Sequence, residues 1–343
     1  MADYRVQVKR HLGPADLAEI SDLLDAAARA DGHRPLGEHK WLDLVRGGRE
    51  GFAGFLAHEV VDAELVGYAQ LSAARDGWGL EAAVHPAHRG WAEDIGRALL
   101  EAALAEARRR GGQVHYWVNQ PTEGQDGDAE SFGFRPDREL IQFRRPLPLD
   151  GTARAGLEDL ALRPFRPGRD ERAWLEVNNR AFADHPEQGG WDLEVLVERE
   201  AEPWFDPAGF LCLWEDDRLV GSCWTKCHLA TDPPLGEIYV ISVDPEHHHR
   251  GLGRALTVAG LDWLATRGMP FAMLYVDAAN SAALGLYRSL GFTEDHRDRA
   301  YVFEVPADAL GAGRSSAARR ADGPADAEGD AGGHRGDGEL TEG

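Results

Sequence analysis

The chain has 343 residues, 43% of them hydrophobic, which is enough for two ordinary domains that each bury a core. Its formal net charge of −22 excludes a broad basic face for the backbone of a nucleic acid. No stretch approaches the roughly 20 apolar residues of a membrane span, and MADYRVQVKRHLG at the N-terminus lacks an apolar signal segment, so we expect a cytoplasmic protein.

Both halves of the chain open with the same kind of pattern. Residues 6–32 and 160–190 each predict a short strand, a turn and an amphipathic helix, because apolar residues first alternate and then recur at helical spacing. Between the halves, PLPLDGT at 146–152 predicts a linker. From about residue 307 onward the chain is mainly Ala, Gly, Asp, Glu and Arg without an aromatic residue, which predicts a disordered tail.

Strands dominate the middle of the second half. The predicted elements are a hairpin of residues 209–214 and 219–228, strands at 236–243 and 271–276, and a helix at 282–290. This order predicts an α/β fold with a mixed, mostly antiparallel sheet flanked by helices. The three cysteines, Cys212, Cys223 and Cys227, are odd in number and form no paired CxxC motif, so we expect reduced thiols and no metal site. A zinc site that also uses His228 is the less favoured alternative.

A weak internal repeat relates the two halves. Three pairs of short strings recur in the same order at separations of 159, 157 and 158 positions. The pairs are VHP and VDP (84–86 and 243–245), IGRAL and LGRAL (95–99 and 252–256), and FGF and LGF (132–134 and 290–292). A period of this length is the size of a domain and not of a solenoid repeat. We therefore predict two tandem domains, residues 1–149 and 150–306, and a tail at 307–343.

The most informative stretch of the second half is VDPEHHHRGLGRAL at 243–256. An apolar strand precedes it and a helical pattern follows it, so the loop presents backbone N–H groups at the positive end of a helix dipole. Gly251 and Gly253 allow an anion to approach the backbone closely, and Arg250 and Arg254 can add charged hydrogen bonds. This combination is typical of a pyrophosphate-binding loop.

The string RGLGRA at 250–255 resembles the acyl-CoA loop of the GCN5-related N-acetyltransferases (GNATs). The pattern N-x-x-A-x-x-x-Y-x-x-x-G-F of that family matches Asn280, Ala283, Tyr287, Gly291 and Phe292. The resemblance implies two GNAT-like domains and acetyl-CoA as the co-substrate. The CoA-binding residues that it implies are Ile241, Ser242, Val243, His248, His249, Arg250, Gly251, Leu252, Gly253, Arg254, Asn280, Ser281, Ala282, Ala283, Leu284 and Gly285.

Two residues of the second half receive catalytic roles from the same resemblance. Glu237, at the start of the strand that leads into the loop, would accept the proton of an attacking amine, and Tyr287 would protonate the departing thiolate. Judged by residue type alone, Glu237 is more readily a solvated charge at a strand end. For Tyr287, a core tyrosine without a chemical role is the less favoured alternative.

Longer strings resemble a narrower group, the tandem GNAT enzymes of actinobacteria that acetylate the cysteinyl amine of cysteinyl-glucosaminyl-inositol. The strings are AFADHPEQGGW (181–191), WTK (224–226), GEIYVISVDPEHHHRGLGRAL (236–256) and LYVDAANSAALGLYRSLGF (274–292). The acceptor contacts that this resemblance implies are Glu38, Glu187, Lys226, Glu237 and Tyr275. As a set they offer carboxylates for an ammonium group and for hydroxyls, and donors from the lysine and the tyrosine.

The first half departs from the GNAT motifs that the second half carries. Its loop reads HRGWAEDIG at 88–96, where Glu93 and Asp94 would repel a pyrophosphate, and residues 119–134 lack the asparagine-to-tyrosine spacing. We expect this domain to be non-catalytic, and to bind CoA weakly or not at all. Weak binding would involve Ala82, Ala83 and Val84. Two fused copies make pairing with another chain unnecessary, so we expect a monomer.

Two other functions remain open from the residues alone. A GNAT that acts on another small amine or on a peptide N-terminus would share the chemistry and differ in its acceptor pocket. A non-catalytic acyl-CoA-binding sensor would keep the loop but would not need Glu237 and Tyr287 at their spacing.

Overall fold

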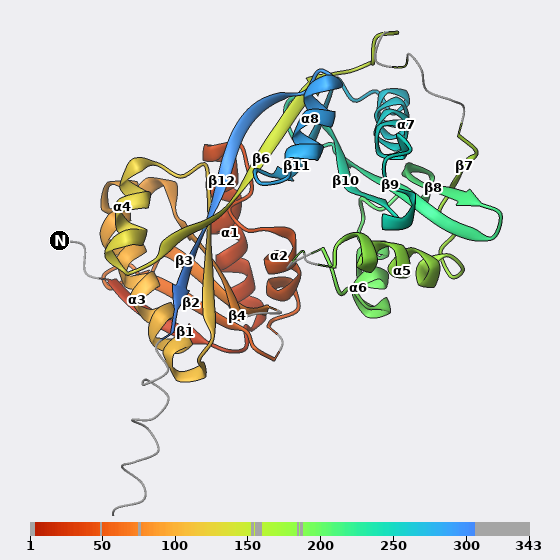
Figure 1. The fold of residues 1–343 in the computed structure, drawn as a ribbon. Coiled ribbons are helices and arrows are strands. Elements are labelled where there is room, and N and C mark those ends of the chain that lie inside the picture. The colour runs from red at the N-terminus through yellow and green to blue at the C-terminus, as the bar shows by residue number, and fades with distance from the viewer. Residues whose placement is uncertain are drawn as a thin grey trace, which may run out of the picture.

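The computed structural model describes residues 4–48, 50–74, 77–151, 154, 160–183, 185 and 188–305. They form two lobes joined along one continuous sheet (Figure 1). The strands are β1 (Tyr4–Lys9), β2 (Ala53–Glu59), β3 (Leu65–Ala74), β4 (Gly77–Val84), β5 (Gln113–Asn119), β6 (Arg135–Pro146), β7 (Leu162–Pro164), β8 (Phe210–Glu215), β9 (Arg218–His228), β10 (Leu235–Val243), β11 (Phe271–Asp277) and β12 (Thr293–Glu304). The α-helices are α1 (Pro14–Asp31), α2 (Glu38–Val45), α3 (Ala92–Arg110), α4 (Glu123–Ser131), α5 (Glu171–Ala181), α6 (Leu193–Glu200), α7 (Leu252–Thr266) and α8 (Ser281–Ser289). Three short 3-10 helices are η1 (Pro86–Trp91), η2 (Pro207–Gly209) and η3 (Pro245–His247).

The predicted elements of the second half are present as the hairpin β8–β9, the strands β10 and β11, and the helix α8. One boundary was wrong. Pro146, which the sequence pattern assigned to the linker, ends strand β6 and faces Phe271 of β11. A proline is compatible with the last position of a strand, because a missing N–H there interrupts no further ladder bond. The predicted tail lies outside the described residues.

In the described part of the chain, the twelve strands follow the order β1-β2-β3-β4-β5-β12-β6-β11-β10-β9-β8-β7. The pairs β4–β5 and β10–β11 are parallel. The other neighbouring pairs are antiparallel. This confirms the predicted α/β fold with a mixed, mostly antiparallel sheet.

The two halves exchange their last strands. Strand β6 of the first half pairs with β11 of the second, β12 of the second half pairs with β5 of the first, and β6 and β12 pair with each other. Each core therefore contains side chains from the other half. Tyr301 and Phe303 of β12 are buried in the core of the first half, and Ile141 and Phe143 of β6 in that of the second. The division at residue 149 stays a prediction, and a cut there would separate strands that share a core.

A second core of the second half is mostly aromatic and lies between its strands and the helices α5 and α6. Trp174 of α5 packs edge-on against Trp224 of β9, and Phe210 stacks on Trp224 with ring centroids 4.4 Å apart. The Trp174 indole N–H donates to the Ser222 hydroxyl at 2.9 Å, so its polar atom is satisfied inside the core. This packing holds α5 against β9 and β10, the two strands that carry the candidate site.

Candidate active site

Strands β10 and β11 diverge beside Glu237. They pair in parallel register only from Leu235 to Glu237, and beyond this point β10 follows β9 whereas β11 follows β6. Residues 238–243 therefore have no ladder partner on β11 among the described residues. Backbone groups on that side of β10 are available to an extended ligand. The predicted CoA contacts on this segment are Ile241, Ser242 and Val243.

A β-bulge marks the point at which β10 leaves β11. The register of β10 against β9 shifts between Ile238 and Val240, so Tyr239 is an extra residue in β10. A bulge bends its strand and increases the local twist. Because the bulge directly follows the last residues that pair with β11, it accounts for the change in direction of β10.

A buried carboxylate fixes the start of the loop that follows β10. Asp244 accepts a hydrogen bond from the Glu246 amide at 3.1 Å and forms ion pairs with Arg180 of α5 and Arg218 of β9. Burial disfavours the charged form, but the Glu246 amide and the two guanidinium groups outweigh it and lower the pKa of Asp244. One ionised side chain thus ties the loop to α5 and β9.

The loop ends in an open helix N-terminus. Gly251 is the N-cap of α7 with a φ of +77°, and no other atom lies within 4 Å of the position that a Cβ would take. His249 also has a left-handed φ, of +62°. The first-turn N–H groups of α7 have no acceptor within the helix. This geometry suits an anion, as the sequence pattern predicted.

Both arginines of the loop have partners in the protein. The Arg250 guanidinium donates to the Glu215 carboxylate at 2.6 and 3.2 Å, and Arg254 donates to the Ser289 hydroxyl of α8 at 3.0 Å. The pairing with Arg250 lowers the pKa of Glu215, so that the carboxylate stays charged at neutral pH. A phosphate that binds Arg250 must therefore replace Glu215.

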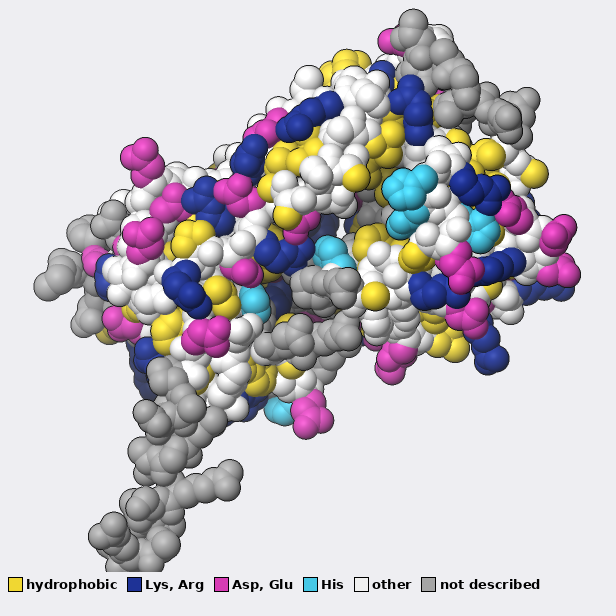
Figure 2. All heavy atoms as spheres, viewed as in Figure 1, with side chains coloured by type: hydrophobic (Ala, Val, Ile, Leu, Met, Phe, Trp, Pro, Cys, Tyr) yellow, Lys and Arg dark blue, Asp and Glu magenta, His cyan; other side chains and the backbone are white. Residues whose placement is uncertain are grey.

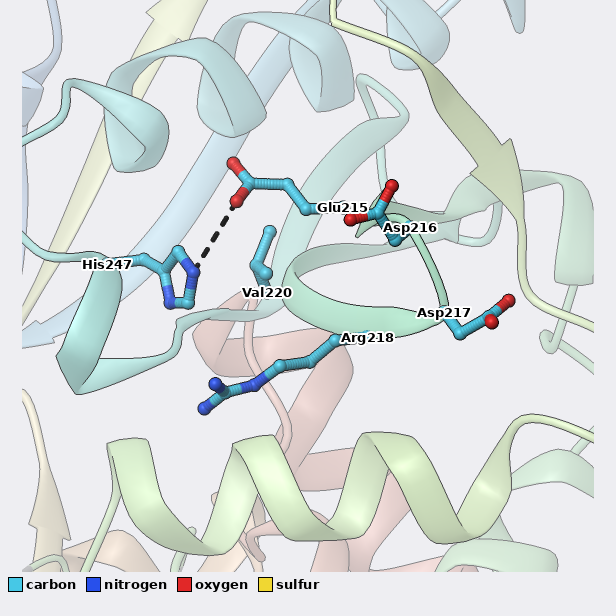
Figure 3. Close-up of a pocket in the computed structure, with 6 residues that line it drawn as sticks. All are labelled: Glu215, Asp216, Asp217, Arg218, Val220 and His247. Carbon is cyan, nitrogen blue, oxygen red and sulfur yellow. Dashed lines mark ion pairs between the residues drawn. The ribbon is translucent and has the colours of Figure 1, made fainter.

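An open cavity of about 440 Å³ lies beside this ion pair (Figure 3). Its lining residues are Glu215, Asp216, Asp217, Arg218, Val220 and His247. In Figure 3 the side chains of Glu215 and His247 point toward each other, with the Glu215 carboxylate 3.5 Å from Nε2 of His247. Three of the six lining side chains are carboxylates, which makes the cavity poorly suited to an anionic ligand.

Glu237 lies at the point of divergence, and its side chain is 12% exposed. Its Oε2 is 2.7 Å from Nε2 of His228 on β9. Lys226 faces Glu237 directly across the β9–β10 ladder, with its Nζ 4.1 Å from the centroid of the Trp204 ring. The structure thus places Glu237 and Lys226 side by side on the sheet. It adds His228, which lies two residues after Lys226 and so on the same face of the strand.

Tyr275 of β11 adjoins this group. Gln142 donates to the Tyr275 hydroxyl at 2.7 Å, and Arg144 donates to the Gln142 side-chain oxygen at 2.6 Å. Although Tyr275 is 40% exposed, desolvation of its hydroxyl, together with the charges of Asp298 and Glu237, raises its pKa. Gln142 and Arg144 belong to β6, so the first half of the chain contributes directly to this site. Sequence reasoning missed both residues because only the strand exchange brings them here.

Tyr287 is buried on α8, where its ring packs against Phe292. Burial, and secondarily the neighbouring Cys223 thiol of β9, raise the pKa of Tyr287. Its hydroxyl is therefore protonated at neutral pH, as a proton donor must be. Asn280 caps the same helix by accepting a hydrogen bond from the Ala283 amide at 3.0 Å.

Some predicted CoA contacts could meet a ligand only through their backbone. Leu252 and Leu284 are buried in the core of the second half, and the Ser242 hydroxyl is buried 3.1 Å from the Ser222 hydroxyl. The exposed ones at the start of α8 are Ser281, Ala282 and Gly285. Backbone contact and core packing are compatible, because they use different atoms of the same residue.

Two predicted acceptor contacts cannot be placed. Glu187 lies outside the described residues, and so does the side chain of Glu38, whose backbone begins α2. A neighbour of Glu187 can be located: Nε2 of His185 is 3.3 Å from the guanidinium of Arg138 on β6. Arg138 also pairs with Asp277 at the end of β11. His185 therefore contacts a strand that lines the site.

The first half repeats the divergence. Strand β4 pairs with β5 only from Gly77 to Leu80. The residues predicted for weak CoA binding, Ala82, Ala83 and Val84, lie beyond this point. In the loop that follows, Asp94 is exposed, whereas the side chain of Glu93 lies outside the described residues.

One group of described side chains in the first half could hold a metal ion. The ligand atoms of Glu64, His85 and His88 lie within 4.8 Å of one another. His85 already accepts a hydrogen bond from the Ala87 amide at Nδ1 (3.3 Å), and His88 lies 3.7 Å from Glu64.

Across the described ranges, none of the helices has the length and apolar character needed to cross a membrane.

Comparison with known proteins gives a consistent assignment. The family model for the acetyltransferase (GNAT) family matches residues 17–134 and 170–292. A mycothiol acetyltransferase of Acidimicrobium ferrooxidans is 48% identical over 86% of this chain and 94% of its own length. A second one, from Thermobispora bispora, is 46% identical over 84% of this chain and 96% of its own.

Solved structures agree on the fold. A GCN5-related N-acetyltransferase from Sphaerobacter thermophilus matches with a TM-score of 0.65 at 24% identity, over 88% of this chain and 96% of that one. A tandem GNAT protein from the clavulanic acid biosynthesis pathway matches with a TM-score of 0.64 at 17% identity, over 89% of this chain and 99% of that one. The chain is an acetyltransferase of the GNAT family, with two GNAT repeats, and it belongs to the mycothiol acetyltransferases.

Proposed function

We propose that this enzyme transfers the acetyl group of acetyl-CoA to the cysteinyl amine of cysteinyl-glucosaminyl-inositol, 1D-myo-inositol 2-(L-cysteinylamino)-2-deoxy-α-D-glucopyranoside. This reaction is the last step of mycothiol biosynthesis. The observation that carries the proposal is the 48% identity to a mycothiol acetyltransferase, in a chain whose Glu237 lies where β10 and β11 diverge and whose Tyr287 is buried on α8.

Acetyl-CoA binds, on this proposal, along the free side of β10. The open N-terminus of α7 around Gly251 holds the pyrophosphate, with Arg250 and Arg254 as cationic partners. The edge of β10 that faces away from β9, at residues 240–243, hydrogen-bonds the extended pantetheine arm. The exposed start of α8 after Asn280 allows a second close approach.

The chemistry needs one base and one acid. The lone pair of the cysteinyl amine attacks the thioester carbon, a C–N bond forms, and Glu237 takes a proton from the nitrogen. The C–S bond then breaks, and the sulfur leaves with the electron pair and takes a proton from the Tyr287 hydroxyl. The raised pKa means that Tyr287 carries its proton before the thiolate forms, and its assignment as the acid comes from the family pattern at Asn280 to Phe292.

The acceptor site is built from both halves of the chain. Lys226 and Tyr275 flank Glu237, and Gln142 of β6 orients the Tyr275 hydroxyl. Glu38 and Glu187 complete the proposed set of carboxylates. The first domain supplies Gln142 and Glu38 and no catalysis of its own, and the enzyme acts as a monomer.

The direct test measures thiol release from acetyl-CoA with cysteinyl-glucosaminyl-inositol as the acceptor, beside a panel of simple amines and peptides, and confirms the product mass. Selective acetylation of the cysteinyl amine is the expected result. Activity on other amines alone would refute the acceptor and keep the chemistry. No turnover with any acceptor would favour an acyl-CoA-binding sensor.

The roles of the two catalytic residues are tested by Glu237→Gln and Tyr287→Phe. We expect kcat to fall by about 10²–10⁴ for each variant, the range for loss of general acid–base catalysis, with little change in CoA affinity. Tyr116→Phe is the matched control, because it removes a phenolic hydroxyl whose pKa is likewise raised by burial, in the first half. Unchanged turnover in Glu237→Gln or Tyr287→Phe would refute the assignment.

A further inference from the structure

A histidine contacts the proposed base. Nε2 of His228 lies 2.7 Å from Oε2 of Glu237, on adjacent antiparallel strands. The register sets His228 opposite Leu235 and Lys226 opposite Glu237, so His228 and Glu237 are diagonal neighbours on one face of the sheet. Their side chains are 27% and 12% exposed, which makes the contact largely sheltered from water.

Lys226, which lies directly opposite Glu237 on β9, has aromatic surroundings. Lys226 extends toward the aromatic rings of Trp204 and Tyr239, with its Nζ 4.1 and 5.2 Å from their centroids. His228 is the last residue of β9, and its backbone is fixed there because the Thr231 hydroxyl donates to the His228 carbonyl at 2.9 Å. The imidazole therefore reaches Glu237 from an anchored backbone.

The hydrogen bond leaves the two carboxylate oxygens of Glu237 in different situations. Oε2 faces the imidazole, and Oε1 has no part in that bond. A carboxylate that serves as a base needs one oxygen directed at the proton it removes, and a hydrogen bond to the other oxygen fixes this orientation and stabilises the ionised form.

We infer that His228 is a positioning residue for Glu237, an inference that rests on the proposed role of Glu237 as the base. The Nε2–H group of His228 donates to Oε2 and holds the carboxylate in one orientation. When the amine attacks, its N–H bond breaks and an O–H bond forms at Oε1. The proton on His228 stays on the imidazole throughout, so the histidine acts through Glu237 and does not touch the substrate.

The test compares three replacements of His228 in the full chain. His228→Gln places an amide N–H where Nε2 was, whereas His228→Asn places it at the position of Nδ1, out of reach. We expect kcat to fall about 10- to 100-fold in His228→Ala and His228→Asn, and to stay within about threefold of the unmodified enzyme in His228→Gln. The KM for acetyl-CoA should change less than twofold in all three. His115→Ala is the matched control, because it removes a histidine 3.4 Å from a carboxylate, Asp137, in the first half.

A double-mutant cycle separates positioning from a structural role. If His228 acts through Glu237, adding His228→Ala to Glu237→Gln should cause no further loss of kcat. Multiplicative losses, or a His228→Gln variant as slow as His228→Ala, would overturn the inference.

Failure of the inference is distinguishable from failure of the proposed function. An unmodified enzyme that acetylates a different amine would refute the proposed acceptor, and the cycle would then be measured with that amine. Full activity in Glu237→Gln would refute the base and the inference together. Impaired Glu237→Gln beside fully active His228→Ala would refute the inference alone.

Discussion

Helices α4 and α8 hold equivalent places in the two halves, 158 positions apart, and differ at one position that matters for chemistry. Each begins after a side-chain cap, Thr122 in α4 and Asn280 in α8. The position of Tyr287 in α8 corresponds to Ala129 in α4, which is completely buried. The first half thus keeps the helix, its cap and its core contact, and lacks the proton donor.

The strands at the divergence differ in the same way. The parallel pairs β10–β11 and β4–β5 can be aligned position by position, which sets Glu237 against Gly79. Lys226, which faces Glu237 on β9, then corresponds to Ser72, which faces Gly79 on β3. The buried Lys40 amino group fills the space beside Gly79, where even a Cβ would collide with it. The comparison teaches that the fold requires the diverging strands, whereas the chemistry depends on a few side chains that only the second half carries.

The unequal repeat separations also have structural causes. Strand β10 has nine residues and β4 has eight, and the additional residue is Tyr239 in the bulge, which changes the separation from 158 to 159. After the strand, the first half uses a six-residue 3-10 helix, η1, where the second half uses three residues in η3. This longer turn shortens the next separation to 157.

Cutting the chain between the halves should have the largest effect. Fragment 1–149 would lose β12, and with it Tyr301 and Phe303 from its core. Removing one large buried aromatic side chain costs about 3–5 kcal/mol, so losing two approaches the whole stability of a domain. We expect fragments 1–149 and 150–305 to be unfolded when produced singly and to co-purify as one folded complex when produced together, judged by circular dichroism and affinity capture.

A cleavable chain provides the control for this experiment. A protease site inserted at Gly151 and cut after folding should leave both fragments together, because the exchanged strands and not the peptide link hold them. Cooperative unfolding of fragment 1–149 alone, at the midpoint of the intact chain, would contradict the shared core and favour two independent domains.

Replacing Gly251 should have the next largest effect. It tests whether the loop of the second half binds CoA and the loop of the first half does not. At a φ of +77° any other residue is strained, and because no atom lies within 4 Å of its Cβ position, a valine there would project into the space proposed for the pyrophosphate. We expect Gly251→Val to weaken CoA binding by about 10- to 100-fold, or about 1.4–2.7 kcal/mol, in calorimetric titration.

A glycine in the loop of the first half serves as the comparison. Gly90 of η1 also has no atom within 4 Å of its Cβ position, so a valine fits there as well. Gly90→Val should leave CoA affinity unchanged if the first half does not use its loop. Equal losses in the two variants would mean that both loops bind CoA, and normal affinity in Gly251→Val would remove the loop from the site.

Much of the second half was predictable because its signals are local. The alternation of Leu235 to Val243, the glycine-containing loop and the capped helix after Asn280 each depend on residues close together in the chain, and all of them are present. The repeat in turn predicted two similar folds, because a duplicated sequence buries its apolar residues in the same pattern.

The rest of the site depends on long-range pairing, which no local pattern encodes. Nothing in the alternation of β6 specifies β11 as its partner, so the contact of Gln142 with Tyr275 could not be foreseen. His228 reaches Glu237 through the register of β9 against β10, and a slip by one residue would send it to the other face. The side chain of Glu38 and residue Glu187 stay predictions.

The smallest expected effect distinguishes helix α2 of the first half from helix α6 of the second. Helix α2 buries Leu42 and Leu44, whereas α6 buries Leu196 and also carries Glu200, whose Oε1 is buried without a hydrogen-bond partner among the described residues. Burial, and secondarily the charge of Glu171, raise the pKa of Glu200 from 4.5 to about 7. The charge of Glu200 therefore lowers the stability of the second half when the pH is high enough to ionise this side chain.

Because the folded chain holds the Glu200 proton up to about pH 7 while the unfolded chain releases it near 4.5, stability should fall as the pH rises between these values. Glu200→Gln keeps the neutral form at every pH. We expect it to leave thermal stability unchanged at pH 4 and to raise it at pH 8 by about 1 kcal/mol, less than the full shift implies because the group is partly exposed. Glu194→Gln, on the exposed first turn of α6, is the control, and identical pH curves for the two variants would place the penalty elsewhere.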